Sequence, residues 1–293
     1  MMADVLHPLR STQGLFGRPN VQWIGAAVLC MLLVSSAGAD QPTDAKETAP
    51  KPESVKPTAE GLLDAYVEAI GGREAWSKVQ SRRISGIYEL ASRGRQFTMT
   101  VVEARPAKRH TLFVPESPQP PFEVGTNGKQ AWTKFGYKPA VVQSDQERKM
   151  TVEFAQFDRY TDWRTHFPKV RYAGKEKVSG KLCHKVVMTP RIGFPETRFF
   201  DAETHLLIKA DEVFAEGDTP QITIFDDYKK VDGVMYPHLL RIDFKGDLRH
   251  KIIAGIEHNV TLPPDEFKMP AYPDPRYPME YQPDLDVPTP PGN

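Results

Sequence analysis

The residue types that most often carry catalysis are present in this chain, but their spacing matches no common catalytic motif. Neither a His-x-x-x-His arrangement nor a Cys-x-x-Cys pair occurs, so the local signature of a metal site is missing. We therefore expect neither a metal ion nor a cofactor. The histidines of the region that we expect to fold are scattered: His110, His166, His184, His205, His238, His250 and His258.

The motifs of acyl transfer and nucleotide binding are missing as well. The sequence contains no Gly-x-Ser-x-Gly elbow, no Gly-x-Gly-x-x-Gly turn and no phosphate-binding loop. Two carboxylate pairs, Asp226 with Asp227 and Asp201 with Glu203, have the residue type for acid–base catalysis. Both pairs lie beside predicted turns at strand ends, where solvated acids are ordinary. We therefore predict that the protein is not an enzyme.

The charge balance argues against nucleic acid as a partner. The chain has 38 Lys and Arg residues and 38 Asp and Glu residues, so its formal net charge is zero. Binding to phosphates requires a basic face, and the overall composition provides no excess of positive charge for one.

The N-terminal region predicts export. Residues 21–39 are mostly apolar, follow Arg10 and Arg18, and end in small residues. The apolar part is shorter than the ~20 residues of a membrane-spanning helix and fits a secretory signal peptide. We predict a signal peptide over residues 1–39, cleavage after Ala39, and a periplasmic or otherwise exported protein. An uncleaved membrane anchor remains the alternative.

Cysteine usage is compatible with an exported protein that folds without disulfides. Cys30 lies in the predicted signal peptide, which leaves Cys183 alone in the mature chain. A single cysteine cannot form an internal disulfide. Its position in an alternating strand pattern predicts a buried, inert thiol.

Composition divides the rest of the chain into three parts. Residues 40–57 are rich in proline and charge, which predicts a flexible linker. Residues 58–270 carry the apolar patterns of one folded domain. Residues 271–293 are again rich in proline and predict an extended tail.

Within the predicted domain, short alternating strands outnumber helices. Helical spacing occurs after Thr58, over residues 73–79 and over residues 144–163. Elsewhere the apolar period is two, and turn residues such as Asn127-Gly128 separate the runs. These patterns predict a mainly β fold with roughly ten antiparallel strands in sequential hairpins.

Large apolar residues recur on one face of several predicted strands. A curved antiparallel sheet can leave an apolar concavity for a ligand. The helices of 59–79 and 144–163 could instead fill that space, and both alternatives stay open at this point. The candidate ligand-binding residues are Tyr88, Leu90, Phe97, Met99, Val101, Ile222, Ile224, Ile252 and Ile256.

Four stretches resemble LolA-like, outer-membrane lipoprotein-sorting-like domains. Residues 58–76 and 83–89 match their opening helix, which ends in Ala-Ile-Gly-Gly, and the following strand with a central glycine. Residues 127–132 match a Gly-x-x-Ala-Trp hairpin, and residues 256–270 match the closing strand with its Phe-x-x-Pro element. The resemblance covers about 58–270.

The resemblance implies a curved antiparallel sheet that forms an incomplete β-barrel around helices, LolA/LolB-like, with an apolar cavity. In the sorting proteins that cavity carries lipoprotein acyl chains across the periplasm, but no individual acyl-handling residue can be matched here. We therefore expect an exported envelope protein that binds a lipid or a lipidated protein non-covalently, with at most transient membrane contact. The alternative is a structural or interaction module of the cell envelope with a filled cavity.

Overall fold

The computed structural model describes residues 57–116 and 121–276. The predicted signal peptide, its cleavage site, nearly all of the linker and residues 277–293 lie outside these ranges. No helix within them is long and apolar enough to cross a membrane.

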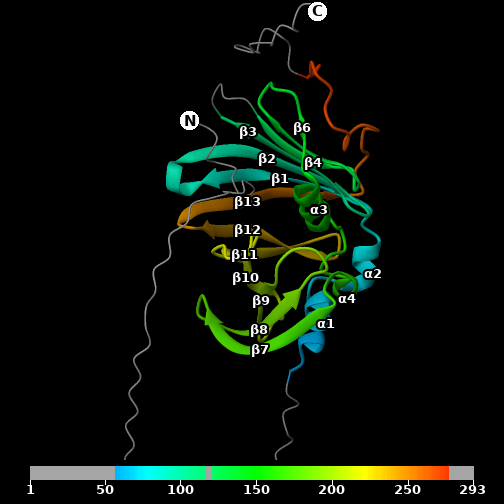
Figure 1. Cartoon of the computed structure of the whole chain (residues 1–293). Coiled ribbons are helices and arrows are strands. Elements are labelled where there is room, and N and C mark those ends of the chain that lie inside the picture. Colours follow the sequence, from blue (N-terminus) through cyan, green and yellow to red (C-terminus); the bar gives the residue numbers. More distant parts are fainter. Residues whose placement is uncertain (1–56, 117–120, 277–293) are drawn as a thin grey trace, which may run out of the picture. The chain divides into compact units, whose positions relative to one another are not determined.

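The described residues contain thirteen strands in a single curved antiparallel sheet (Figure 1). The order across the sheet is β6-β5-β4-β3-β2-β1-β13-β12-β11-β10-β9-β8-β7. Because β6 and β7 are its two free edges, the sheet is not a closed barrel. The mainly β prediction is confirmed. The strands are β1 (Ser81–Leu90), β2 (Arg95–Ala104), β3 (Lys108–Pro115), β4 (Phe122–Thr126), β5 (Ala131–Phe135), β6 (Val141–Val142), β7 (Lys169–Val178), β8 (Lys181–Thr189), β9 (Glu196–Asp201), β10 (Leu207–Glu212), β11 (Gln221–Val231), β12 (Val234–Phe244) and β13 (Asp247–His258).

The helices begin at the capping residues that the sequence indicates. Thr58 Oγ1 accepts a hydrogen bond from Gly61 N at 3.1 Å and starts α1 (Ala59–Ala69). Helix α2 (Gly72–Ser77) follows directly. Ser144 and Glu147 form a capping box at the start of α3 (Asp145–Phe154).

The predicted helix over 144–163 is wrong in its length. Helix α3 ends at Phe154, and α4 (Trp163–His166) is a separate short turn. Between them, the backbone N–H of Phe157 donates to the carbonyl oxygen of Pro106 at 2.8 Å. This contact with a distant loop replaces the next helical hydrogen bond.

One face of the sheet packs against α1 and α2, and we call it the inner face. Leu63 and Val67 of α1 belong to the same buried cluster as Val186, Met188 and Phe200 of β8 and β9. Trp76 of α2 packs edge-on against Tyr236 of β12, with ring centroids 5.4 Å apart. Figure 1 shows α1 beside β7 and β8. Because side chains along a strand alternate between the two faces of a sheet, the strand register then assigns each remaining strand residue to the inner or the outer face.

The Ala-Ile-Gly-Gly end of α1 joins this helix to the β11–β12 turn. Ile70 O accepts a hydrogen bond from Met235 N at 3.0 Å. Gly71 has φ 116°, and a Cβ there would lie 2.5 Å from the carbonyl oxygen of Gly233. The motif is therefore a packing element that requires glycine.

The central glycine of β1 allows a close approach of β13. The register between the two strands shifts at Ser85 and Gly86, and a Cβ on Gly86 would lie 2.1 Å from Ile252 O.

We expect Gly86→Ala to lower the free energy of unfolding by about 1–3 kcal/mol, because backbone atoms must move. Urea unfolding measures this. Thr98→Ala, on an exposed site of the neighbouring strand, should change it by less than about 0.5 kcal/mol; equal effects of both substitutions would contradict the prediction.

The C-terminal segment, residues 259–276, contains neither helix nor strand after β13. It contacts the outer face of β3–β5 through Glu266, Asp274 and Arg276. The first part of the predicted tail, residues 271–276, is thus packed on the sheet.

Candidate functional site

A continuous row of aromatic rings crosses the inner face of β1–β5. Phe97 and Tyr88 are paired across β2 and β1, and Phe113, Phe122 and Phe135 follow on β3, β4 and β5. Successive ring centroids are 6.3 Å apart for Tyr88–Phe97, 4.9 Å for Tyr88–Phe113, 6.1 Å for Phe113–Phe122 and 4.6 Å for Phe122–Phe135. We call these five residues the aromatic stripe.

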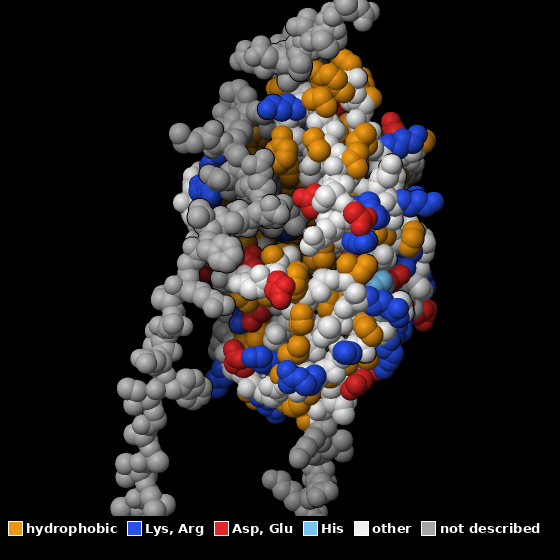
Figure 2. Space-filling view, viewed as in Figure 1, with side chains coloured by type: hydrophobic (Ala, Val, Ile, Leu, Met, Phe, Trp, Pro, Cys, Tyr) orange, Lys and Arg blue, Asp and Glu red, His pale blue; other side chains and the backbone are white. Residues whose placement is uncertain are grey.

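The aromatic stripe runs from the interior to solvent. Tyr88 and Phe97 are buried, Phe113 and Phe122 are half-buried, and Phe135 is 47% exposed. Beside Phe135, Val141 and Val142 of β6 are also exposed. Figure 2 shows hydrophobic side chains gathered at this end of the sheet, at the top of the view. An apolar ligand could therefore reach the inner face from the β5–β6 edge.

Five of the sequence-predicted ligand residues lie on or beside the aromatic stripe. Tyr88 and Phe97 belong to it, and Leu90, Met99 and Val101 occupy the same inner face of β1 and β2. Leu90 and Met99 are buried.

Ile256 is on the inner face too, but away from the stripe. It packs against the cluster of Trp76, Val79 and Tyr236 beneath α2. The structure therefore gives this residue a packing role that the sequence pattern did not separate from ligand contact.

Three predicted residues, Ile222, Ile224 and Ile252, do not share that face, so the prediction of one shared face is wrong for them. Lys251, not Ile252, pairs with Tyr88 on the inner side, and Ile252 is 43% exposed on the outer side.

The physical reason lies in the patterns of β11 and β13. In β13, adjacent Ile252 and Ile253 give no alternation from which to choose a face. In β11, Ile224 packs on the outer face, where a small apolar cluster also exists. That cluster contains Val178, Cys183, Phe199 and Ile208. Cys183 is fully buried in it, and burial raises the pKa of its thiol.

Three residues of the aromatic stripe, Phe113, Phe122 and Phe135, are not among the ligand-binding residues predicted from the sequence. A signal was present, because the turn at Asn127-Gly128 pairs Thr126 with Ala131 and thereby places Phe122 opposite Phe135. Extending the register of one hairpin to the next strand would have brought Phe113 to the same row.

Beneath α1 the inner face is filled. Leu63 and Tyr66 of α1 and Met188, Phe200 and Leu207 of the sheet surround a space of about 10 Å³. That volume holds at most one water molecule. The inner face beneath α1 therefore has no room for an alkyl chain.

Buried charges occupy the centre of the inner face, which the apolar pattern did not predict. Arg198 forms ion pairs with Glu196 and Glu212, each at 2.6 Å. Glu103 is paired with both Arg82 and Arg109. Although burial alone would raise it, these two guanidinium groups lower the pKa of Glu103 to about 2.

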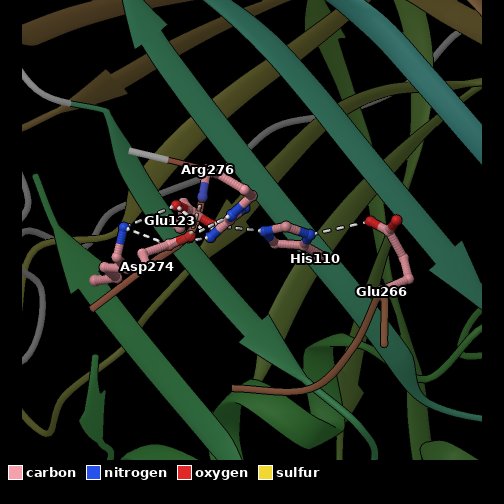
Figure 3. Close-up of polar contacts among 6 residues, drawn as sticks. His110, Glu123, Glu266, Asp274 and Arg276 are labelled. Carbon is pink, nitrogen blue, oxygen red and sulfur yellow. Dashed lines mark hydrogen bonds and ion pairs between the residues drawn. The ribbon is translucent and has the colours of Figure 1, made fainter. Parts of the chain in front are cut away.

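A second charged cluster lies on the outer face under the C-terminal segment (Figure 3). Glu123 is fully buried and lies 3.0 Å from His110 Nε2, 3.1 Å from Arg276 and 3.5 Å from Lys134 Nζ. Lys134 also contacts Asp274 at 3.0 Å, and His110 Nδ1 lies 3.0 Å from Glu266. We call these six residues the outer charge cluster. When His110 is protonated, the charges of the outer charge cluster sum to zero. This balance fits a structural role in holding the C-terminal segment against the sheet.

A shallow pocket of about 250 Å³ lies beside α2. Trp76, Arg105 and Asp158 are among the residues lining it, and Arg105 is paired with Asp158. This ion pair within the lining neutralises two of the charges that could otherwise contact a ligand.

The residues that could have served catalysis have structural contacts. Asp201 Oδ1 accepts hydrogen bonds from the N–H groups of Glu203 and Thr204, both at 2.9 Å, and so stabilises a turn. Asp226 pairs with Arg241 at 3.0 Å on the surface. Within residues 57–116 and 121–276, no three His, Cys, Asp or Glu side chains are grouped so as to hold a metal ion.

Comparison with known proteins shows that this chain is similar in fold to several solved structures. No family model matches the sequence, and no curated protein matches it either. Among solved structures, a LolA superfamily protein from Nitrosomonas europaea superposes with a TM-score of 0.51 at 10% identity. A DUF1329 family protein from Desulfovibrio piger superposes with a TM-score of 0.50 at 14% identity. Each comparison covers 72% of this chain and 97% of the other.

These similarities, together with the open thirteen-stranded sheet, confirm the predicted LolA-like fold. At such low identity they carry no information about ligand or activity.

Proposed function

We propose that this LolA-like chain is an exported envelope protein that binds an apolar ligand, a lipid or the acyl chain of a lipidated protein, on its inner face. Binding is reversible burial with no covalent step. The observation that carries the proposal is the aromatic stripe, which leads from the buried Tyr88 and Phe97 to the exposed Phe135.

The stripe supplies the free energy that such binding needs. Each CH₂ group that leaves water contributes ~0.8 kcal/mol, so contact of a short alkyl segment with several rings is sufficient for micromolar affinity. The proposal of export is supported by the apolar residues 21–39, which fit a signal peptide.

The test combines native mass spectrometry of the purified protein with binding of an added alkyl probe, dodecanol. We expect bound lipid in the purified sample and measurable dodecanol affinity after delipidation. Phe113→Ala should weaken dodecanol binding about tenfold, which corresponds to ~1.4 kcal/mol, because it interrupts the stripe. Absence of any bound chain, before and after addition of the probe, would refute the proposal.

Ile252→Ala is the matched control. It also removes a large apolar side chain from a strand of the same sheet, but from the outer face. Dodecanol binding should be unchanged in this variant. Thermal unfolding of both variants separates loss of binding from loss of fold.

The filled space beneath α1 and the burial of Leu90 and Met99 favour a second candidate, a structural or interaction module of the envelope. In that case Phe113→Ala would lower stability, and no alkyl probe would bind to either the original chain or the variant.

A further inference from the structure

Lys251 has an unusual position on the inner face. It lies in β13, with Tyr88 of β1 and Leu240 of β12 as its Cα partners on either side. Tyr88 is the ring from which the aromatic stripe leads through Phe113 to β5. Lys251 is thus the neighbour, across the strand pair, of the ring at the buried end of the stripe.

The charges around Lys251 leave it without a counter-ion of its own. Glu103 is already shared by Arg82 and Arg109, and Glu212 is paired with Arg198 at 2.6 Å. Within the part of the chain that the structure describes, the side chain of Lys251 forms neither an ion pair nor a hydrogen bond.

Two further cations add to the local positive potential. Burial, the nearby Arg109 and Arg249 together lower the pKa of Lys251, against the opposing effect of Glu212 and Glu103. Lys251 is half-buried, and an ammonium that is partly removed from water without a partner is costly unless an anion compensates it. The position therefore suits a negative group brought by a ligand.

We propose that Lys251 binds the anionic head of a single-chain amphiphile whose alkyl chain lies along the aromatic stripe. The shared chemistry is a carboxylate or phosphate at the end of one alkyl chain. This inference rests on the proposed function and specifies its ligand class. A neutral head at the same place would leave the ammonium uncompensated.

The experiment compares three probes with the same chain, dodecanoate, dodecyl phosphate and dodecanol, by equilibrium dialysis against the delipidated protein. We expect the anionic probes to bind about tenfold more tightly than dodecanol, as one charge-assisted contact gives. Lys251→Met should reduce this ratio to about one without weakening dodecanol binding. The stronger of the two anions identifies the natural head group.

Two further variants make the result specific. Lys251→Arg keeps the positive charge and should retain the preference for anionic heads. Lys230→Met removes an exposed lysine of β11 and should also retain it. Thermal unfolding should show Lys251→Met folded and no less stable, since it loses a half-buried charge that has no ion-pair partner.

The inference and the proposed function fail in different ways. Equal affinity for dodecanoate and dodecanol in the original chain, or a preference that survives Lys251→Met, overturns the role of Lys251 alone. Failure of all three probes to bind refutes the proposed function itself.

Discussion

Replacing Glu123 with glutamine is expected to lower the free energy of unfolding by about 3–5 kcal/mol. Glu123 is fully buried between Lys134, His110 and Arg276. Removing one member of a buried ionic group leaves the opposite charges uncompensated, which is the costly case. Urea unfolding measures the loss. Hydrogen exchange should at the same time show weaker protection in residues 259–276, because Arg276 loses its contact with the Glu123 carboxylate and keeps the one with Asp274.

A matched substitution tests whether burial is the cause. Glu257→Gln changes the same group at a site where the side chain is 63% exposed and 3.9 Å from Arg83. Its effect should stay within about 0.5 kcal/mol. If Glu257→Gln and Glu123→Gln destabilise the protein equally, the outer charge cluster is not the source of the stability.

The cost of Glu123→Gln should also depend on pH. Although burial disfavours the charged ring, Glu123 and Glu266 raise the pKa of His110 above its ordinary 6.5. The stabilisation that protonated His110 gives to the fold is therefore complete below pH 6.5 and is lost as the pH rises through the raised pKa of His110. Glu123 has a lowered pKa despite burial, so its stabilisation is present above pH 4.5 and lost on acidification. The difference in the free energy of unfolding between Glu123→Gln and the original chain should be largest between pH 4.5 and pH 6.5.

Replacing Arg198 with methionine should have a comparable effect, about 3–5 kcal/mol, on the inner face. Arg198 is almost fully buried, pairs with Glu196 and Glu212, and donates to Tyr160 Oη. Methionine fills much of the same volume but leaves the buried Glu196 and the half-buried Glu212 with less positive charge nearby. Thermal or urea unfolding reports the loss.

A second substitution should recover part of that stability. In Arg198→Met with Glu212→Gln, the carboxylate left without its arginine is gone, so the double variant should be more stable than the single one. Arg171→Met, at an exposed site of β7, serves as the control and should be nearly neutral. A double variant that loses the sum of both single effects would argue against direct coupling.

Much of the fold could be predicted because its determinants are local. The hairpin turn at Asn127-Gly128, the cap at Thr58 and the capping box at Ser144 each depend on residues within a few positions of one another. The period of two and the glycine turns likewise identified a mainly β chain. The end of α3 escaped prediction because Phe157 bonds to Pro106, some fifty positions earlier in the chain.

The candidate site was only partly predictable, because a strand pattern says which residues alternate but not which side is inner. Ile222 and Ile224 form a regular apolar row, yet the outer face also has an apolar cluster and receives Ile224. Conversely, Arg198, Glu196 and Lys251 look like solvent-facing residues in the sequence and lie on the inner face.

By itself, the sequence determined the mainly β class, the helix starts and two of the five residues that form the aromatic stripe, Tyr88 and Phe97. Only the tertiary structure decided which face each strand turns inward and which charges are buried. The outer charge cluster illustrates the reason, since Arg276 lies 153 positions from the Glu123 that it contacts. Turns and caps depend on near neighbours in the chain, whereas burial depends on which distant segment covers a side chain.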